Sequence, residues 1–263
     1  MEIAALLVVN GVVTALCFLA LWLVSLRLKD VSFIDSWWAL GLVVTAFVSF
    51  MNAPGSPHAV ALFLLCAIWG LRLGGYLLWR WRSHGVDRRY AAILGRAQAR
   101  RGWSFAWASL VMVFALQAPL QWIVSLPVQL GAMGATPALG ALAWGGVALT
   151  VAGILFETIG DWQLTRFRAD PANAGKVLDN GLWRYTRHPN YFGDACVWWG
   201  LWLIAADAGF GPWALPGPVL MTYLLTSLSG VPTVEGHLAR SKPAYADYVR
   251  RTSGFIPLPP RRD

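Results

Sequence analysis

Side chains suited to binding or catalysis gather between Glu157 and Asp194 of this 263-residue chain. They comprise carboxylates, guanidinium groups, an imidazole, an amide and phenols: Glu157, Asp161, Arg166, Arg168, Arg184, Tyr185, Arg187, His188, Asn190, Tyr191 and Asp194. Pro189 lacks a backbone donor and disfavours the helical conformation for His188, so a turn is predicted there. Such an array suits a ligand that carries phosphates, sugar hydroxyls and a carboxamide.

The upstream part of this segment predicts a polar helix face. Glu157 and Asp161 are four residues apart, and Thr165 and Arg168 extend the stripe if the helix continues. Ionisable groups at membrane depth are costly unless they face protein or water, so the stripe is a candidate functional face. The alternative is that these side chains merely reach out of the membrane at a helix end.

The rest of the chain consists largely of apolar segments. It is 57% hydrophobic and only 13% charged, which excludes an ordinary soluble surface. Because a bilayer needs about 20 apolar residues per helix, we predict an all-α, polytopic membrane protein with seven transmembrane helices. The predicted spans are residues 3–26, 33–51, 59–78, 105–126, 138–159, 192–206 and 212–230. The first is too long for the core of a signal peptide and lacks a basic start.

Positive charge predicts the orientation of these spans. All 21 Lys and Arg residues except Arg72 fall in the first, third and fifth loops or in the tail. Cytoplasmic loops retain positive charge, so we expect the N-terminus outside and the C-terminus in the cytoplasm. Orientation thereby accounts for the net charge of +8, and nucleic-acid binding is not expected. Cys17, Cys66 and Cys196 lie in apolar runs and are interpreted as packing residues, without disulfides or a metal.

Two charged residues inside apolar segments are further candidates. Asp35 is flanked by Trp37 and Trp38, where burial would keep it protonated as a hydrogen-bond donor; a helix-cap carboxylate is the alternative. Arg72 would pair with Asp35 or with a cofactor phosphate, or else form a structural pair. The third loop contains a charged strip made of Arg80, Arg82, Asp87, Arg88, Arg89 and Tyr90. This strip predicts an anchor against anionic lipid, with phosphate contacts from Arg80 or Arg89 as the sharper alternative.

The run from Arg187 to Asp194, with Asp161 and Arg168 upstream, resembles the membrane steroid 5-alpha-reductase family and the related sterol C14 reductases. The closest resemblance is to the bacterial branch of that superfamily. It covers roughly residues 157–257, including the closing segment Tyr-Ala-Asp-Tyr-Val-Arg-Arg-Thr-Ser-Gly-Phe-Ile-Pro. The N-terminal half matches mainly in hydropathy.

The resemblance implies one integral membrane domain, with substrate-side helices in residues 1–104 and a cofactor-side half in residues 105–263. It implies NADPH at the cytoplasmic side, in a bacterial inner membrane, and hydride transfer to an activated carbon-carbon double bond of a lipid. The cofactor residues expected from it or from charge are Asp161, Arg168, Tyr185, Arg187, His188, Asn190, Tyr191, Asp194, Glu235, Tyr248, Arg250, Arg251, Arg72 and Arg80. His237 is a further candidate beside Glu235.

The substrate end matches the family less well. Steroid reductases polarise a ketone with a carboxylate on the second helix and a tyrosine on the third. Asp35 lies near the former position, but Trp69 falls near the latter, so Asp35 with help from Tyr76 is the expected catalytic pair. The expected substrate is a 3-oxosteroid-like lipid, another isoprenoid or an unsaturated acyl chain.

Two other functions remain open from the sequence. Isoprenylcysteine and phospholipid methyltransferases, which use S-adenosylmethionine, share an Arg-His-Pro-x-Tyr-x-Gly turn, although Asn190, Asp194 and the pair Asp161 and Arg168 favour the reductase pattern. A non-enzymatic lipid-binding or transport protein would use the basic loops only for topology. Substitution of Asn190 or Arg168 by Ala separates this last class from a cofactor enzyme.

Overall fold

The computed structural model describes residues 2–53, 55–228, 230–231, 235–236 and 242–261. Within these ranges the chain is helical and contains no strand, which confirms the all-α prediction. It divides into two compact units. Unit 1 comprises Met1–Trp144 and Leu201–Gly217, and unit 2 comprises Gly145–Gly200 and Pro218–Asp263.

Five helices within the described ranges are long and apolar enough to cross a membrane. They are α1 (Ile3–Leu28), α2 (Ile34–Met51), α3 (Pro57–His84), the segment Phe105–Val124 and α8 (Ala141–Ala169). They match the first five predicted spans. The sixth predicted span falls on α9 (Pro189–Asp207), and the seventh on α10 (Gly211–Ala214), α11 (Pro216–Tyr223) and a π-helix, Leu224–Leu228. Integral membrane character is thus supported by five helices, while seven spans stay a prediction.

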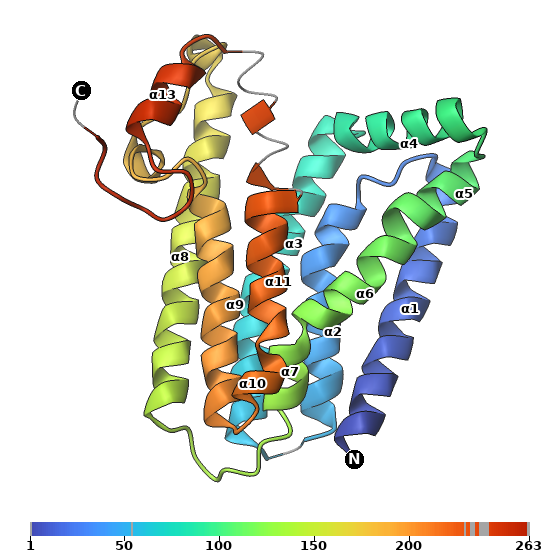
Figure 1. Cartoon of the computed structure of the whole chain (residues 1–263), viewed down its shortest axis with the longest axis vertical. Coiled ribbons are helices and arrows are strands. Elements are labelled where there is room, and N and C mark those ends of the chain that lie inside the picture. Colours follow the sequence, from blue (N-terminus) through green and yellow to red (C-terminus); the bar gives the residue numbers. More distant parts are fainter. Residues whose placement is uncertain (1, 54, 229, 232–234, 237–241, 262–263) are drawn as a thin grey trace. The chain divides into compact units, whose positions relative to one another are not determined.

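The third loop is not an irregular strip, because residues Arg88–Arg101 form helix α4. Asp87 caps its N-terminus by accepting a hydrogen bond from the backbone N–H of Arg89, and Gly102 ends it in the left-handed conformation. Leu94 and Ala97 are its buried residues. Figure 1 shows α4 lying crosswise to α1, α2 and α3 at the end where α3 finishes.

The core of unit 1 joins α4 to the spanning helices. One cluster of its buried hydrophobic residues consists of Phe18, Val31, Phe33, Ile34, Leu94, Ala97, Ala108, Val113 and Phe114. The fourth span is built from α5 (Phe105–Ser109), a π-helix over Leu110–Phe114 and α6 (Ala115–Val124), which contains Pro119. It is followed by α7 (Leu126–Gly131). These packed elements hold the first turn of α2 and the first turn of α4 close together.

At the other end of α3, a buried histidine and a carboxylate join distant segments of unit 1. His58 is fully buried, and its Nε2 lies 2.8 Å from Oδ2 of Asp207. The same carboxylate accepts a hydrogen bond from the backbone N–H of Gly140 at 3.0 Å. Asp207 therefore ties the start of α3 to the segment that leads into α8.

In unit 2, helices α8 and α9 pack closely through glycines. A Cβ atom at Gly153 would lie 2.6 Å from the carbonyl oxygen of Gly193, and one at Gly193 would lie 2.6 Å from the backbone nitrogen of Glu157. At Gly200 it would meet the hydroxyl of Thr150. Gly193 therefore lets the backbones of α8 and α9 approach closely. The unit ends with α13, Tyr245–Arg251.

Candidate functional site

The acidic face predicted on α8 exists, because the helix continues to Ala169. Glu157 and Asp161 are buried, with 2% and 6% of their surface exposed. Nδ2 of Asn190 donates a hydrogen bond to Oδ1 of Asp161 at 3.1 Å. Asp194, one turn along α9, is also buried. Of the cofactor candidates, Asp161 and Asp194 are therefore buried in unit 2, and the half-buried Asn190 is in direct contact with Asp161.

The glycines of α8 and α9 explain how this contact forms. A Cβ atom at Gly160 would lie 3.2 Å from the backbone nitrogen of Asn190 and the ring of Pro189. Because Gly160 precedes Asp161, the start of α9 packs directly beside the carboxylate. Pro189 is the first residue of α9, as the turn prediction required. The Asp161–Asn190 pair offers an acceptor and a donor on adjacent helices.

The turn before α9 is held by an ionic cluster. Oε1 of Glu235 accepts hydrogen bonds from Nε of Arg187 at 2.7 Å and Nε2 of His188 at 2.9 Å. The ring of Tyr191 stacks on His188, with centroids 5.3 Å apart. Burial raises the pKa of Glu235, but the bonds from His188 and Arg187 outweigh it and lower the pKa to about 2. Glu235 is thus ionised near neutral pH, and its negative charge is paired with the guanidinium of Arg187.

Arg187 also fastens the C-terminal segment. Its Nη1 donates to the carbonyl oxygens of Thr252 at 2.7 Å and Val249 at 3.2 Å, and its backbone N–H donates to Ser253. The hydroxyl of the buried Tyr248 donates to the carbonyl of Trp183 at 2.5 Å. Arg187 and Tyr248 therefore hold the C-terminal segment in place, a structural role that the sequence did not predict.

The remaining tail candidates lie closer to solvent. Arg250 is 74% exposed along its side chain and pairs with Asp247, and Arg251 pairs with the same carboxylate at 2.9 Å. Tyr185 is 43% exposed, and its carbonyl accepts the N–H of Leu258. His237 lies outside the described residues.

Arg168, another of the cofactor candidates, lies on the exposed end of α8 and lines a hollow of about 210 Å³. The hollow is also lined by Phe167, Asp170, Pro171, Asn173, Ala174, Gly175 and Lys242. Asp161, Asn190 and Asp194 are not among its lining residues. Burial, and then the positive charge of Arg168, lower the pKa of Lys242. Two cations from distant segments thus face one hollow.

Asp35 lies in a second polar network, in unit 1. In the first turn of α2, its Oδ1 accepts a hydrogen bond from the hydroxyl of Tyr90 at 2.6 Å. Its Oδ2 accepts one from Nη2 of Arg89 at 2.8 Å and lies 4.0 Å from Arg80. Gln117 donates to the Tyr90 hydroxyl at 3.4 Å. Every one of these partners of Asp35 is a donor, so both of its carboxylate oxygens act as acceptors, whereas the sequence predicted Asp35 as a donor.

Tyr90 is the functional candidate that sequence reasoning missed. Burial, then the negative charge of Asp35, raise the pKa of Tyr90 well above its ordinary value, so the phenol keeps its proton. The expected partner Tyr76 instead stacks on Trp79, with ring centroids 6.0 Å apart. Tyr90 follows Asp87, a helix-cap residue type, by three positions. That cap was the available signal that residue 90 belongs to a helix.

The other candidates of α3 and the strip have distinct surroundings. Trp69 is buried, and Arg72 is half-buried in the same helix. Arg89 also binds Asp87 at 2.8 Å, so two carboxylates account for its position. Nη2 of Arg80 lies 4.0 Å from Oδ2 of Asp35, farther away than the guanidinium of Arg89. Arg80 and Arg89 therefore belong to the carboxylate network of unit 1.

Comparison with known proteins identifies the family. Residues 21–252 match the model of a family described as "Protein of unknown function (DUF1295)". Because the match covers most of the chain, the chain belongs to this family. No curated protein and no solved structure matches this chain.

Proposed function

We propose that this member of the DUF1295 family is an NADPH-dependent membrane reductase that reduces an activated carbon-carbon double bond of a lipid. The observation that carries the proposal is the hydrogen bond from the half-buried Asn190 to the buried carboxylate of Asp161, between α9 and α8. Polar groups buried in apolar helices are expensive and mark functional sites by default. The resemblance of the Arg187–Asp194 run to steroid 5-alpha-reductases supports the same assignment.

The donor set of unit 2 fits a nicotinamide dinucleotide in its chemistry. A carboxylate beside a carboxamide, as in Asp161 and Asn190, complements an amide or sugar hydroxyls. Arg168 and Lys242 present two cations to one hollow, which suits a phosphate group. When bound, the dinucleotide would supply the hydride. The additional phosphate that distinguishes NADPH from NADH matches the pair of cations, Arg168 and Lys242.

Unit 1 supplies the acid chemistry in this proposal. In the reaction the phenol of Tyr90 turns its single proton away from Asp35 and donates it in a hydrogen bond to a carbonyl conjugated with the double bond, where it stabilises the negative charge that develops on the carbonyl oxygen. Asp35, bound at 2.6 Å, orients the phenol, and Arg89 holds Asp35. Tyr90 thus takes the proton-donor role considered for Asp35 and Tyr76, and Asp35 becomes a positioning residue.

The finer membrane arrangement belongs to the proposal as well. We place seven spans in a bacterial inner membrane, with the N-terminus outside and the dinucleotide reached from the cytoplasm. The confinement of Lys and Arg to alternate loops supports this orientation. An apolar bundle also provides the dry surroundings that a lipid substrate and a developing oxyanion require.

A ligand-binding experiment tests the function. The full chain in lipid nanodiscs should gain thermal stability with NADPH and not with S-adenosylmethionine. Asn190→Ala should abolish the gain, whereas Asn52→Ala, which removes a half-buried amide that donates to the carbonyl of Val48 at the end of α2, should retain it. Stabilisation by S-adenosylmethionine alone would establish the methyltransferase alternative, and stabilisation by neither ligand would reject the reductase.

A further inference from the structure

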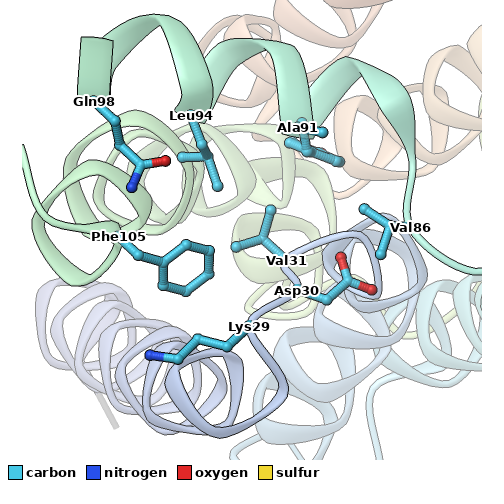
Figure 2. Close-up of a pocket in the computed structure, with 9 residues that line it drawn as sticks. Lys29, Asp30, Val31, Val86, Ala91, Leu94, Gln98 and Phe105 are labelled. Carbon is cyan, nitrogen blue, oxygen red and sulfur yellow. The ribbon is translucent and has the colours of Figure 1, made fainter.

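A hollow of about 220 Å³ in unit 1 lies outside the proposed chemistry of unit 2. Its lining comes from the turn after α1, the residues around the start of α4 and the start of α5: Lys29, Asp30, Val31, Val86, Tyr90, Ala91, Leu94, Gln98 and Phe105. Figure 2 shows that Val31, Leu94 and Phe105 turn their apolar side chains toward one another inside it. Lys29, Gln98 and Asp30 bring polar groups to its edge. The hollow is therefore amphipathic.

The polar edge includes a well-positioned cation. Lys29 ends α1 in the left-handed conformation, with φ of 54°. Its ammonium group lies 5.5 Å from the centre of the Phe105 ring. This contact holds the cation beside the apolar floor, where it is less free to move than an ordinary surface lysine.

The hollow lies at the ends of two candidate spans, where a membrane would change from hydrocarbon to headgroups. Lys29 directly follows the first spanning helix, and Phe105 is the first residue of the fourth. Helix α4 crosses the ends of the spans, with Arg88, Arg96, Arg100 and Arg101 exposed and Ile93 41% exposed (Figure 1). Trp107, close to Phe105, is 52% exposed. Exposed arginines and a tryptophan around one helix are typical of the membrane interface.

We propose that this hollow binds one anionic phospholipid of the surrounding bilayer. Its phosphate contacts Lys29 and Gln98, and the start of its acyl chain covers Val31, Leu94 and Phe105. Charge complementarity selects the occupant, because Lys29 lines the hollow and helix α4, which forms one side of it, carries four exposed arginines. The one acid in the lining, Asp30, already accepts bonds from the backbone and hydroxyl of Ser32 and from Trp81 at 2.7 Å.

Occupancy of this hollow would bear on the Asp35 network. Tyr90 lines the hollow and donates its hydroxyl to Asp35. A bound lipid would therefore pack against the phenol ring and hold the first turn of α4 in place. The proposal does not depend on the reductase assignment, since it rests on the lining and the charge of the hollow and on no step of the reduction.

Native mass spectrometry of the full chain, titrated with phosphatidylglycerol and with phosphatidylcholine, tests this site. Phosphatidylglycerol should bind more tightly, and Lys29→Gln should weaken it about fivefold, the effect of one cation near an anionic surface. Arg27→Gln is the matched control, because Arg27 is an exposed cation in the last turn of α1 that does not line the hollow. Equal losses in both variants would show general charge attraction and overturn the site.

A second pair of variants tests the shape of the hollow without changing charge. Ala91→Phe places a ring in the hollow and should displace phosphatidylglycerol, whereas Ala92→Phe, on an exposed position outside the lining, should not. Equal affinity of these two variants contradicts the proposal. Inorganic phosphate is the third arm, and competition by phosphate at the same concentration as the lipid would reassign the site to a free anion.

Discussion

Replacement of Glu235 by Gln tests the ionic cluster that holds the turn before α9. The cluster lowers the pKa of Glu235 from 4.5 to about 2. At about 1.4 kcal/mol per pKa unit, the charge on Glu235 stabilises the folded state by about 3 kcal/mol at neutral pH. Only 23% of the Glu235 side chain is exposed, so solvent screening reduces this value modestly. Gln keeps an acceptor for Arg187 but loses the charge.

The loss should appear first in the segment that Arg187 fastens. We expect the backbone amides of residues 248–252 to exchange with deuterium about 100-fold faster in Glu235→Gln, as the local opening energy falls by about 3 kcal/mol. Hydrogen-exchange mass spectrometry in nanodiscs measures this directly. Asp247→Asn is the control, because Asp247 also pairs with two arginines but is exposed to solvent. It should change the exchange little.

The pH dependence gives an independent check on the sign. A carboxylate whose pKa is lowered by folding stabilises the folded state above its unfolded pKa, and this contribution is lost as the pH falls. The difference in thermal stability between wild type and Glu235→Gln should therefore be full at pH 7 and shrink between about pH 4.5 and pH 2. A constant difference across this range, or exchange no faster than in Asp247→Asn, would refute the electrostatic explanation.

Three further changes test other parts of the molecule. Tyr90→Phe should lower the rate of reduction of a 3-oxo-4-ene steroid probe about 100-fold, measured by the loss of NADPH absorbance, and should leave the affinity for NADPH unchanged. An unchanged rate would show that Tyr90 takes no part in the chemistry. Arg168→Gln and Lys242→Gln should each weaken NADPH binding in calorimetry and leave NADH binding unchanged, and parallel losses for both coenzymes would contradict a phosphate site. Gly193→Ala should lower the free energy of unfolding by about 1–3 kcal/mol in thermal unfolding, because the added Cβ meets the α8 backbone. Gly145→Ala, with open space around it, should not destabilise the protein, and equal effects of the two variants would exclude the close packing of α8 and α9 as the cause.

The sequence predicted the helices of unit 2 better than it predicted the contacts between them. Pro189 predicted where α9 begins, and the spacing of Glu157 and Asp161 predicted one buried face of α8. The sequence also placed Arg168 on that face, but α8 runs beyond the core by that point and the side chain is exposed. Helical periodicity gives the direction of a side chain, whereas exposure depends on where the neighbouring helices end.

In unit 1 the sequence identified Asp35 and failed to identify its partners. Charge density marked the third loop as a basic strip, and the same residues form a capped amphipathic helix that brings Arg89 and Tyr90 to the start of α2. The contact joins residues 55 positions apart. Such pairing depends on how α4 packs on the core through Leu94 and Ala97, which no local pattern specifies.

The glycines at positions 153, 193 and 200 leave the two helices of unit 2 almost no freedom to diverge during evolution or design. Each faces backbone or a buried hydroxyl at a distance that admits no additional carbon atom. The segment from Asp170 to Asn180, by contrast, is formed largely of short turns at the surface. Engineers who wish to alter ligand preference can therefore substitute residues of this surface segment, because the spacing of α8 and α9 is set by other residues.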